Sequence, residues 1–89
     1  MNTPNKNQLR RLSAIVHVLN SCRLMSITQI QEKVNDIMDE NFSRSTIEKD
    51  LFNLKMNYDL EYETFMNRGI KLDSKVDFLG ILKNHLNLF

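Results

Sequence analysis

The sequence predicts a small domain of α+β class, mainly helical, with one β-hairpin. Three stretches carry apolar residues at the three- and four-residue spacing of amphipathic helices, within residues 5–22, 28–40 and 43–58. A stretch with alternating polarity and a glycine turn, residues 60–73, then predicts two strands joined as a hairpin. A fourth helical pattern over residues 74–88 completes the expected architecture.

Composition is that of one small globular domain spanning residues 1–89, with 42% apolar residues. A single cysteine, Cys22, excludes an internal disulfide, and two histidines far apart in sequence argue against a metal site. No apolar run is long enough to span a membrane and no signal-peptide core is present, so we expect a cytoplasmic protein. The net charge of +1 is a weak signal for a nucleic-acid partner.

The first two helices are predicted from their apolar spacing and their end signals. Thr28 is expected to cap the second helix, with Gln31 completing a capping box. Asn41 is expected to supply the left-handed turn that follows, because asparagine tolerates this conformation. The short segment 23–27 is predicted to pair with the hairpin as a brief strand. The stripes expected in the core consist of Leu9, Leu12, Ile15, Val16 and Leu19, then Ile27, Ile30, Val34 and Ile37.

The third helix has the most regular pattern. Its inward stripe is expected to consist of Ile47, Leu51, Leu54 and Tyr58, and Ser43 is expected to cap the first turn. At about 100° per residue, Ser45, Lys49, Phe52 and Met56 fall on the opposite face. We expect the hairpin or the first helix to cover Phe52 and Met56, and the alternative is an interaction patch. Asp50 is expected to orient a nearby basic residue or a backbone group.

The order of helix, turn, helix and hairpin is that of a winged helix-turn-helix, in which residues 43–58 are the helix offered to DNA. The residues Ser43, Thr46, Ile47, Asp50, Leu51 and Leu54 spell S-x-x-T-I-x-x-D-L-x-x-L. This pattern resembles the recognition helix of the winged-helix domains at the N-terminus of DeoR-type and WYL-domain bacterial regulators. The resemblance runs from about Asn5 to Asp73, with L-x-Y-E and G-I-K-L in the hairpin.

The resemblance implies a winged helix-turn-helix with an additional C-terminal helix. It also implies sequence-specific binding of double-stranded DNA in bacterial or phage transcription regulation, by occlusion or by recruitment at a promoter. In such regulators a ligand-sensing domain follows the winged helix. This chain is therefore expected to be either a fragment lacking a C-terminal sensing domain or a small stand-alone regulator.

A helix in the major groove reads bases with its N-terminal half, so Ser45, Thr46 and Lys49 are the expected base readers. Backbone amides at the start of the second helix favour phosphate, and Arg68 in the hairpin turn is placed to reach the backbone or minor groove. Glu48 would repel phosphate unless it accepts from a cytosine amino group. The full set of expected DNA contacts is Thr28, Gln29, Ser43, Arg44, Ser45, Thr46, Lys49, Arg68 and Lys71.

The last helical pattern is more apolar than one packing face requires, which predicts a homodimer. The expected interface consists of Phe78, Leu79, Leu82, Leu86 and Phe89. No nucleophile motif or glycine-rich phosphate loop indicates an enzyme, and no cofactor is implied. The alternative to DNA binding is a winged helix that serves as a protein-interaction module. The near-neutral charge, Glu48 and the pair Phe52 and Met56 favour that alternative.

Overall fold

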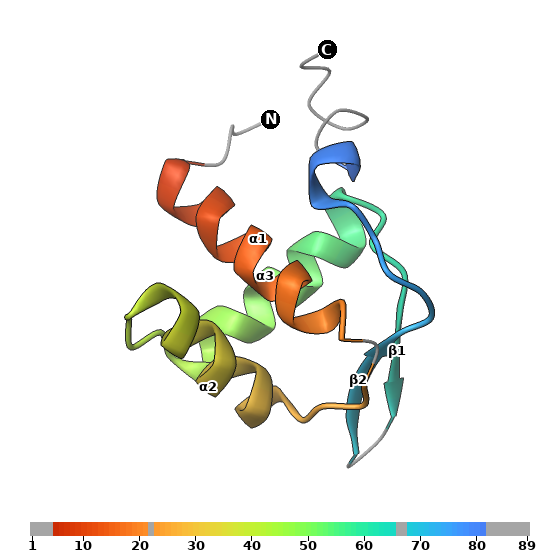
Figure 1. Cartoon of the computed structure of the whole chain (residues 1–89), viewed down its shortest axis with the longest axis horizontal. Coiled ribbons are helices and arrows are strands. Elements are labelled where there is room, and N and C mark those ends of the chain that lie inside the picture. The colour runs from red at the N-terminus through yellow and green to blue at the C-terminus, as the bar shows by residue number, and fades with distance from the viewer. Residues whose placement is uncertain (1–4, 22, 66–67, 82–89) are drawn as a thin grey trace.

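The computed structural model describes residues 5–21, 23–65 and 68–81. The elements follow in the order α1 (Lys6–Leu19), α2 (Ile27–Met38), α3 (Arg44–Asn57), β1 (Tyr62–Phe65) and β2 (Gly69–Leu72). The two strands pair antiparallel, and a helical turn over 78–81 begins a fourth helix (Figure 1). The α+β class predicted from the sequence is confirmed, and the order of elements is the one expected for a winged helix.

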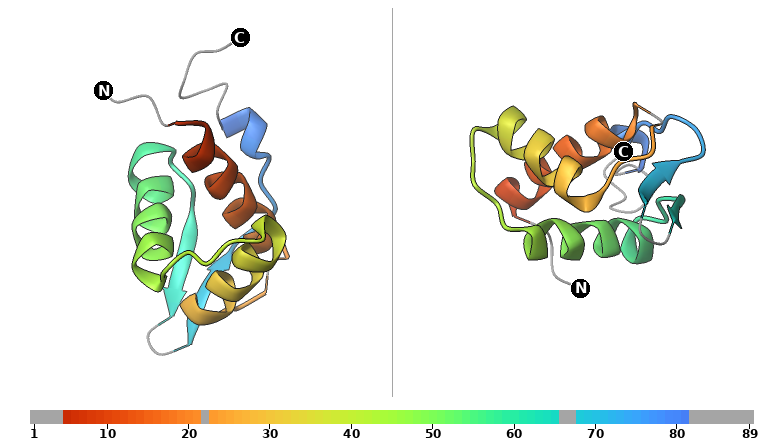
Figure 2. Two further views of the ribbon diagram at one scale, coloured as in Figure 1. Left: turned by 90° about the vertical axis from the view of Figure 1, so that its left-hand side faces the viewer. Right: turned by 90° about the horizontal axis from the view of Figure 1, so that it is seen from below.

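The three helices enclose one apolar core, and the hairpin closes one side of it (Figures 1 and 2). The inward stripe of α3 was predicted correctly, since Ile47, Leu51 and Leu54 are at most 2% exposed. Because this stripe is packed against α1 and α2, the opposite face of α3 is turned to solvent. Other fully buried members of the core are Leu12, Ile15, Val16, Leu19, Met25, Ile30, Val34 and Leu72. Ile37, expected in the core, is exposed.

The cap of α2 differs from the prediction, because Ser26 and not Thr28 precedes the helix. The Ser26 hydroxyl accepts from the Gln29 amide at 3.1 Å, and the Gln29 side-chain oxygen accepts from the Ser26 amide at 2.9 Å. The reason lies in the preceding residue. Met25 is paired with Ile70 of the hairpin through two backbone hydrogen bonds of 2.7 and 3.1 Å, so the chain can turn into the helix directly after it.

The turn between α2 and α3 is fastened by side chains of α2. Asn35 accepts from the Phe42 amide at 2.8 Å and donates to the Phe42 carbonyl at 3.1 Å. Gln31, expected in a capping box, instead donates to the same carbonyl at 3.0 Å. The left-handed residue after α2 is Asp39, with φ 53°, and not Asn41. These contacts set the angle at which α3 follows α2.

The predicted brief strand before α2 is present as a single bridge between Met25 and Ile70. Gly69 makes this close approach possible, because its φ is +130° and a Cβ there would lie 2.0 Å from the Met25 carbonyl oxygen. Ile70 and Leu72 are buried and Lys71 is exposed, as the alternation predicted. The hairpin is thereby attached to the start of α2 as well as to α3.

The fourth helix begins at Phe78 and not at Ser74. Asn20 holds the backbone of Val76 through two hydrogen bonds of 2.8 and 2.9 Å, which keeps this part of the chain out of a helix. Asp77 is the cap, since its carboxylate accepts from the Leu79 amide at 3.1 Å. Leu82, Leu86 and Phe89, expected at a dimer interface, lie outside the described residues.

Candidate nucleic-acid interface

The outer face of α3 is the candidate interface. Ser43 caps the helix by accepting from the Thr46 amide at 3.2 Å, and its hydroxyl also lies 3.1 Å from the Thr46 hydroxyl. Ser45 and Lys49, in the first two turns, are exposed. The right-hand view of Figure 2 shows α3 along the outside of the molecule, with no described segment over its outer side.

An internal ion pair fixes α3 against α1. Asp50 is 3% exposed, and its carboxylate accepts from Arg11 through Nε and, at 3.0 Å, through Nη2. The Arg11 guanidinium also lies 5.0 Å from the centroid of the Phe42 ring. The hydrogen bond to Asp50 raises the pKa of Arg11 above its ordinary value. This paired geometry fixes the rotation of α3 about its own axis.

Asp50 was expected to orient a basic residue or a backbone group, and in the structure it binds the basic residue Arg11. The sequence offered Lys6 and Arg10 on the same early turns of α1. Arg11 is the partner because α1 packs against α3 with this residue facing Asp50, which is 39 residues away in the sequence. The one signal in the sequence was an acidic residue beside an apolar stripe, which requires a partner when it is buried.

The remaining predicted contacts on α3 fall into two groups. Within the described residues, the side chains of Ser45 and Lys49 have no hydrogen-bond or ion-pair partner. Arg44 pairs through Nε with Glu48 at 2.9 Å, and both side chains are more than half exposed. Thr46 is half-buried and bound to Ser43, so it belongs to the cap of the helix.

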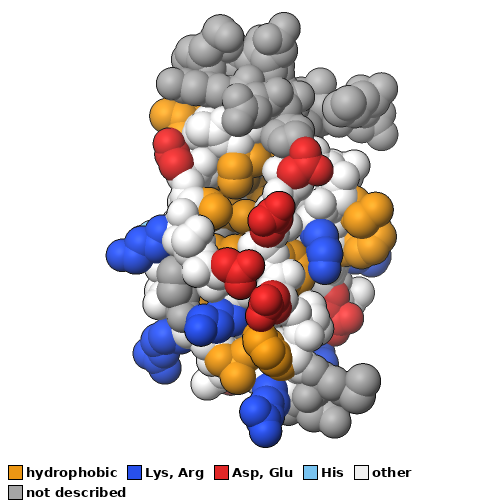
Figure 3. Space-filling view, turned by 90° about the vertical axis from the view of Figure 1, so that its right-hand side faces the viewer, with side chains coloured by type: hydrophobic (Ala, Val, Ile, Leu, Met, Phe, Trp, Pro, Cys, Tyr) orange, Lys and Arg blue, Asp and Glu red, His pale blue; other side chains and the backbone are white. Residues whose placement is uncertain are grey.

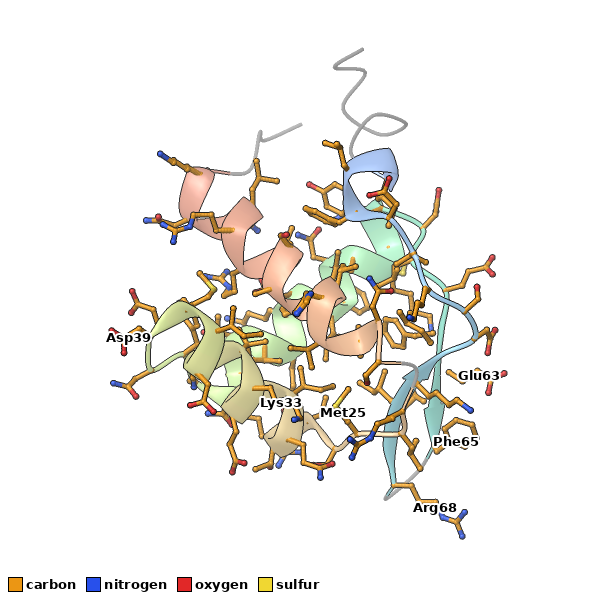
Figure 4. All side chains as sticks on the ribbon, in the orientation of Figure 1. Met25, Lys33, Asp39, Glu63, Phe65 and Arg68 are labelled. Atoms are coloured by element: carbon orange, nitrogen blue, oxygen red, sulfur yellow. The ribbon has the colours of Figure 1, made fainter. Side chains whose placement is uncertain are left out.

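The expected contacts outside α3 are exposed. Thr28 and Gln29 lie in the first turn of α2, where the Gln29 side-chain oxygen is engaged in the capping box. Arg68 projects from the end of the hairpin, away from the body of the molecule (Figure 4), and Lys71 is exposed on β2. In the left-hand view of Figure 2, the hairpin end, the start of α2 and the start of α3 lie toward the same end of the molecule.

The face formed by the hairpin and the segment after it carries carboxylates in its middle, with lysine and arginine side chains around them (Figure 3). Figure 3 shows several carboxylates gathered along the middle of this face. Asp59, Glu61 and Asp73 line two adjoining hollows there, and Glu63 is exposed on β1 nearby. Phosphates are repelled by the carboxylates in the middle of this face, whereas Arg68 and Lys71 of the same hairpin are exposed cations.

Phe52 and Met56 were expected to be covered, and that expectation is wrong. They are 64% and 60% exposed. The hairpin packs on the neighbouring flank of α3 instead. There the Tyr62 hydroxyl donates to the Leu51 carbonyl at 3.0 Å, and the Lys55 ammonium lies 4.9 Å from the centroid of the Tyr62 ring. The apolar pair therefore remains open to solvent.

The described part of the expected dimer interface opens onto a groove of about 890 Å³ between α1, the end of α2 and the start of the fourth helix. Leu79 and Ile37, each 53% exposed, line this groove. Phe78 also lines it, but is half-buried and packs on the Tyr58 ring with centroids 6.5 Å apart. The charged residues along the groove are Arg10, His17, Asp39 and Asp77.

No protein-family model, curated protein or solved structure matches this chain significantly. Across residues 5–21, 23–65 and 68–81, no group of three or more His, Cys, Asp or Glu side chains is arranged to hold a metal ion. Within the same ranges, no helix combines the length and the apolar character needed to cross a bilayer. The functional proposal consequently depends on the geometry of α3 and its surroundings.

Proposed function

We propose that this chain is a winged helix-turn-helix protein that binds double-stranded DNA in bacterial or phage transcription regulation in the cytoplasm, without a cofactor. The observation that carries the proposal is the outer face of α3. Ser45 and Lys49 are exposed in its first two turns and have no partner among the described side chains. A helix held by its buried face, with free polar groups near its N-terminus, suits insertion into a major groove.

The distribution of charge supports the same orientation. The exposed charged residues of α3 are three cations, Arg44, Lys49 and Lys55, and one anion, Glu48. The hairpin face carries the acidic residues described above (Figure 3). A duplex is therefore attracted to the α3 side and repelled from the carboxylates in the middle of the hairpin face, although the net charge of +1 gives little attraction at long range.

Two further elements would contact the backbone of a duplex lying against α3. The first turn of α2 presents amides near Thr28 and Gln29, which favour phosphate. Arg68 at the hairpin end extends toward the adjacent backbone or minor groove, and Lys71 lies on the same hairpin. These contacts position the protein, while α3 reads the sequence.

The proposed function includes a homodimer, because two-fold symmetry places two recognition helices about 34 Å apart, one turn of DNA. Leu79, together with Leu82, Leu86 and Phe89 beyond the described residues, would form the contact. The groove beside Leu79 carries basic residues, Arg10 and His17, and acidic residues, Asp39 and Asp77. Such a mixture can pair with itself across a two-fold axis.

Fluorescence anisotropy with mixed-sequence duplex DNA at low and high salt tests the proposal. We expect affinity to fall steeply with salt, and Lys49→Ala to weaken binding by about 1–3 kcal/mol. The matched control is Lys33→Ala. Lys33 is an exposed lysine of α2, labelled in Figure 4, that lines a hollow with α1 residues and is not among the expected DNA contacts.

Glu48→Gln adds a second arm to this experiment. It removes a carboxylate from the reading face and releases Arg44 from its ion pair, so affinity for mixed duplexes should rise. Weak binding that is independent of salt and equal in all variants would contradict DNA binding. Reduced affinity of Glu48→Gln for every duplex would contradict the placement of α3 in the groove.

The exposure of Phe52 and Met56 favours a second candidate function, a protein-interaction module. An exposed apolar pair on a helix is a common contact for another protein. This function predicts no salt-dependent binding of duplex DNA. It also predicts that partner binding is sensitive to Phe52→Ser and insensitive to Lys49→Ala.

A further inference from the structure

Phe52 and Met56 are the most exposed large apolar side chains among the described residues. They follow Ser45 and Lys49 along α3. At about 100° per residue, these four side chains fall within an arc of roughly 60°. The outer face of α3 is therefore one continuous stripe, polar in its first half and apolar in its second half.

The apolar half of the stripe is not required by the fold. The core side of α3 is filled by Ile47, Leu51 and Leu54, and the hairpin rests on Lys55 and the Leu51 carbonyl. The other strongly exposed apolar residues, Ile37 and Leu79, border the groove on α1 instead. Phe52 and Met56 are thus free to contact any molecule that binds at Lys49.

The charge around the stripe matches a nucleic acid. Lys49 precedes Phe52 by one turn and Lys55 lies on the adjoining flank, while Glu48 is the one exposed acidic residue of α3. The apolar group that B-DNA offers to a helix in its major groove is the C5-methyl of thymine, and phenylalanine is among the side chains that contact it. The polar half of the stripe then faces hydrogen-bonding groups on the base edges, and the apolar half faces thymine methyl groups, in the same major groove.

The spacing along α3 also fits. At 1.5 Å per residue, Phe52 lies about 4.5 Å beyond Lys49 along the helix axis. This is little more than the rise of one base pair, about 3.4 Å. A side chain at position 52 therefore falls on the base step next to the one that Lys49 reads.

We infer that α3 reads thymine methyl groups, with Phe52, supported by Met56, contacting the C5-methyl beside a base read by Lys49. This inference rests on the proposed DNA binding. Because lysine favours the acceptors of guanine, the preferred site holds a guanine and a thymine at neighbouring steps. The contact separates thymine from cytosine, and it also separates thymine from uracil, which has the same pairing edge and no methyl group.

The test uses a duplex that the full chain selects from a random-sequence pool, and a copy of it synthesised with uracil in place of every thymine. We expect wild-type protein to bind the uracil copy about fourfold more weakly for each contacted methyl, the value of one buried carbon. Phe52→Ala should bind the thymine duplex more weakly and should bind both duplexes equally. Phe52→Leu should retain part of the difference.

Leu24→Ala is the matched control. It removes an exposed apolar side chain that lies outside both the stripe and the groove beside Leu79, and it should keep the full difference between the two duplexes. Far-ultraviolet circular dichroism of Phe52→Ala should match wild type, because the side chain is exposed and its loss opens no cavity.

The possible failures are distinguishable. If no duplex is selected at all, the proposed function is wrong. If wild type binds both duplexes tightly and equally, DNA binding stands and methyl reading is wrong. If Phe52→Ala keeps the preference for thymine, another residue makes the contact. If Phe52→Ala also has unchanged affinity for both duplexes, Phe52 makes no contact with the DNA.

Discussion

At the scale of single residues, the pair of Arg11 and Asp50 shows how an acidic residue is accommodated on the buried side of α3. The carboxylate is buried and neutralised by two hydrogen bonds from one guanidinium, so it is withdrawn from the solvent-exposed face of α3. The exposed acid of α3 is Glu48, which is paired with Arg44. The pair of Arg11 and Asp50 orients α3, and the pair of Arg44 and Glu48 partly neutralises the charge on its surface.

Arg11→Ala should destabilise the domain by about 3–5 kcal/mol, because it leaves a buried carboxylate without a partner. Urea unfolding followed by circular dichroism measures this loss. Arg44→Ala is the control. It breaks an ion pair whose side chains are 62% and 52% exposed, and should change stability by less than about 0.5 kcal/mol.

The double variant Arg11→Leu with Asp50→Leu should lose less stability than Arg11→Ala alone, since no uncompensated charge remains. Equal losses in Arg11→Ala and Arg44→Ala would show that the buried pair contributes no more than a surface pair. DNA binding by the folded fraction of Arg11→Ala should also weaken, because the rotation of α3 is no longer fixed.

At the scale of elements, the hairpin is joined to α3 chiefly by Tyr62. Its hydroxyl donates to the Leu51 carbonyl at 3.0 Å while its ring packs beneath the Lys55 ammonium. Burial raises the pKa of Tyr62 above its ordinary value, because the ionised phenol is poorly solvated there. The same hairpin is bound to the start of α2 by Met25, so one element sets the positions of two helices.

The raised pKa predicts how stability depends on alkaline pH. The folded pKa lies above the unfolded value of about 10, so the stabilisation is complete below about pH 10 and is lost as pH rises through the folded pKa. Tyr62→Phe should cost about 1 kcal/mol at neutral pH, from the lost hydrogen bond, and should make the alkaline decline shallower. Urea unfolding across this pH range measures both effects.

Some alkaline decline should persist in Tyr62→Phe, because burial also raises the pKa of Tyr58. In the combined Tyr58→Phe and Tyr62→Phe variant, the free energy of unfolding should decline even less as the pH rises. A decline identical to that of wild type in both variants would exclude these two tyrosines as its cause.

At the scale of the whole molecule, the face proposed to read DNA and the groove proposed for association lie on different elements. The first is the outer side of α3, and the second lies among α1, α2 and the start of the fourth helix. A two-fold contact through the groove would therefore leave both copies of α3 free. This separation is what a dimer that reads two half-sites requires.

Leu79→Glu should convert a homodimer into a monomer, because it places a carboxylate in an apolar contact that already holds Asp77. Light scattering over a range of concentrations measures the change, and DNA affinity should fall as the second half-site is lost. Leu24→Glu is the control, since Leu24 is 40% exposed outside the groove. A wild-type monomer at all concentrations would exclude the dimer, and a dimer that survives Leu79→Glu would place the contact elsewhere.

The sequence by itself determined the features that depend on near neighbours in the chain. The three- and four-residue spacing of Ile47, Leu51 and Leu54 sets the buried face of α3, and with it the exposure of Ser45 and Lys49. The alternation around Ile70 and Leu72 likewise sets the two sides of the hairpin. Period and burial are linked locally, so no knowledge of the fold is required.

The tertiary structure alone decided the features that depend on residues far apart in the chain. Three such contacts join Arg11 to Asp50, Asn20 to Val76, and Met25 to Ile70. Each of them changed or completed a prediction made from the local sequence. Ser26, and not Thr28, caps α2 because the pairing of Met25 with Ile70 ends directly before it. Both Ser26 and Thr28 are followed three positions later by a glutamine that could complete a capping box. Phe52 is exposed because Tyr62 packs on the other flank of α3. The packing of the hairpin determines this position, and the local spacing of apolar residues does not.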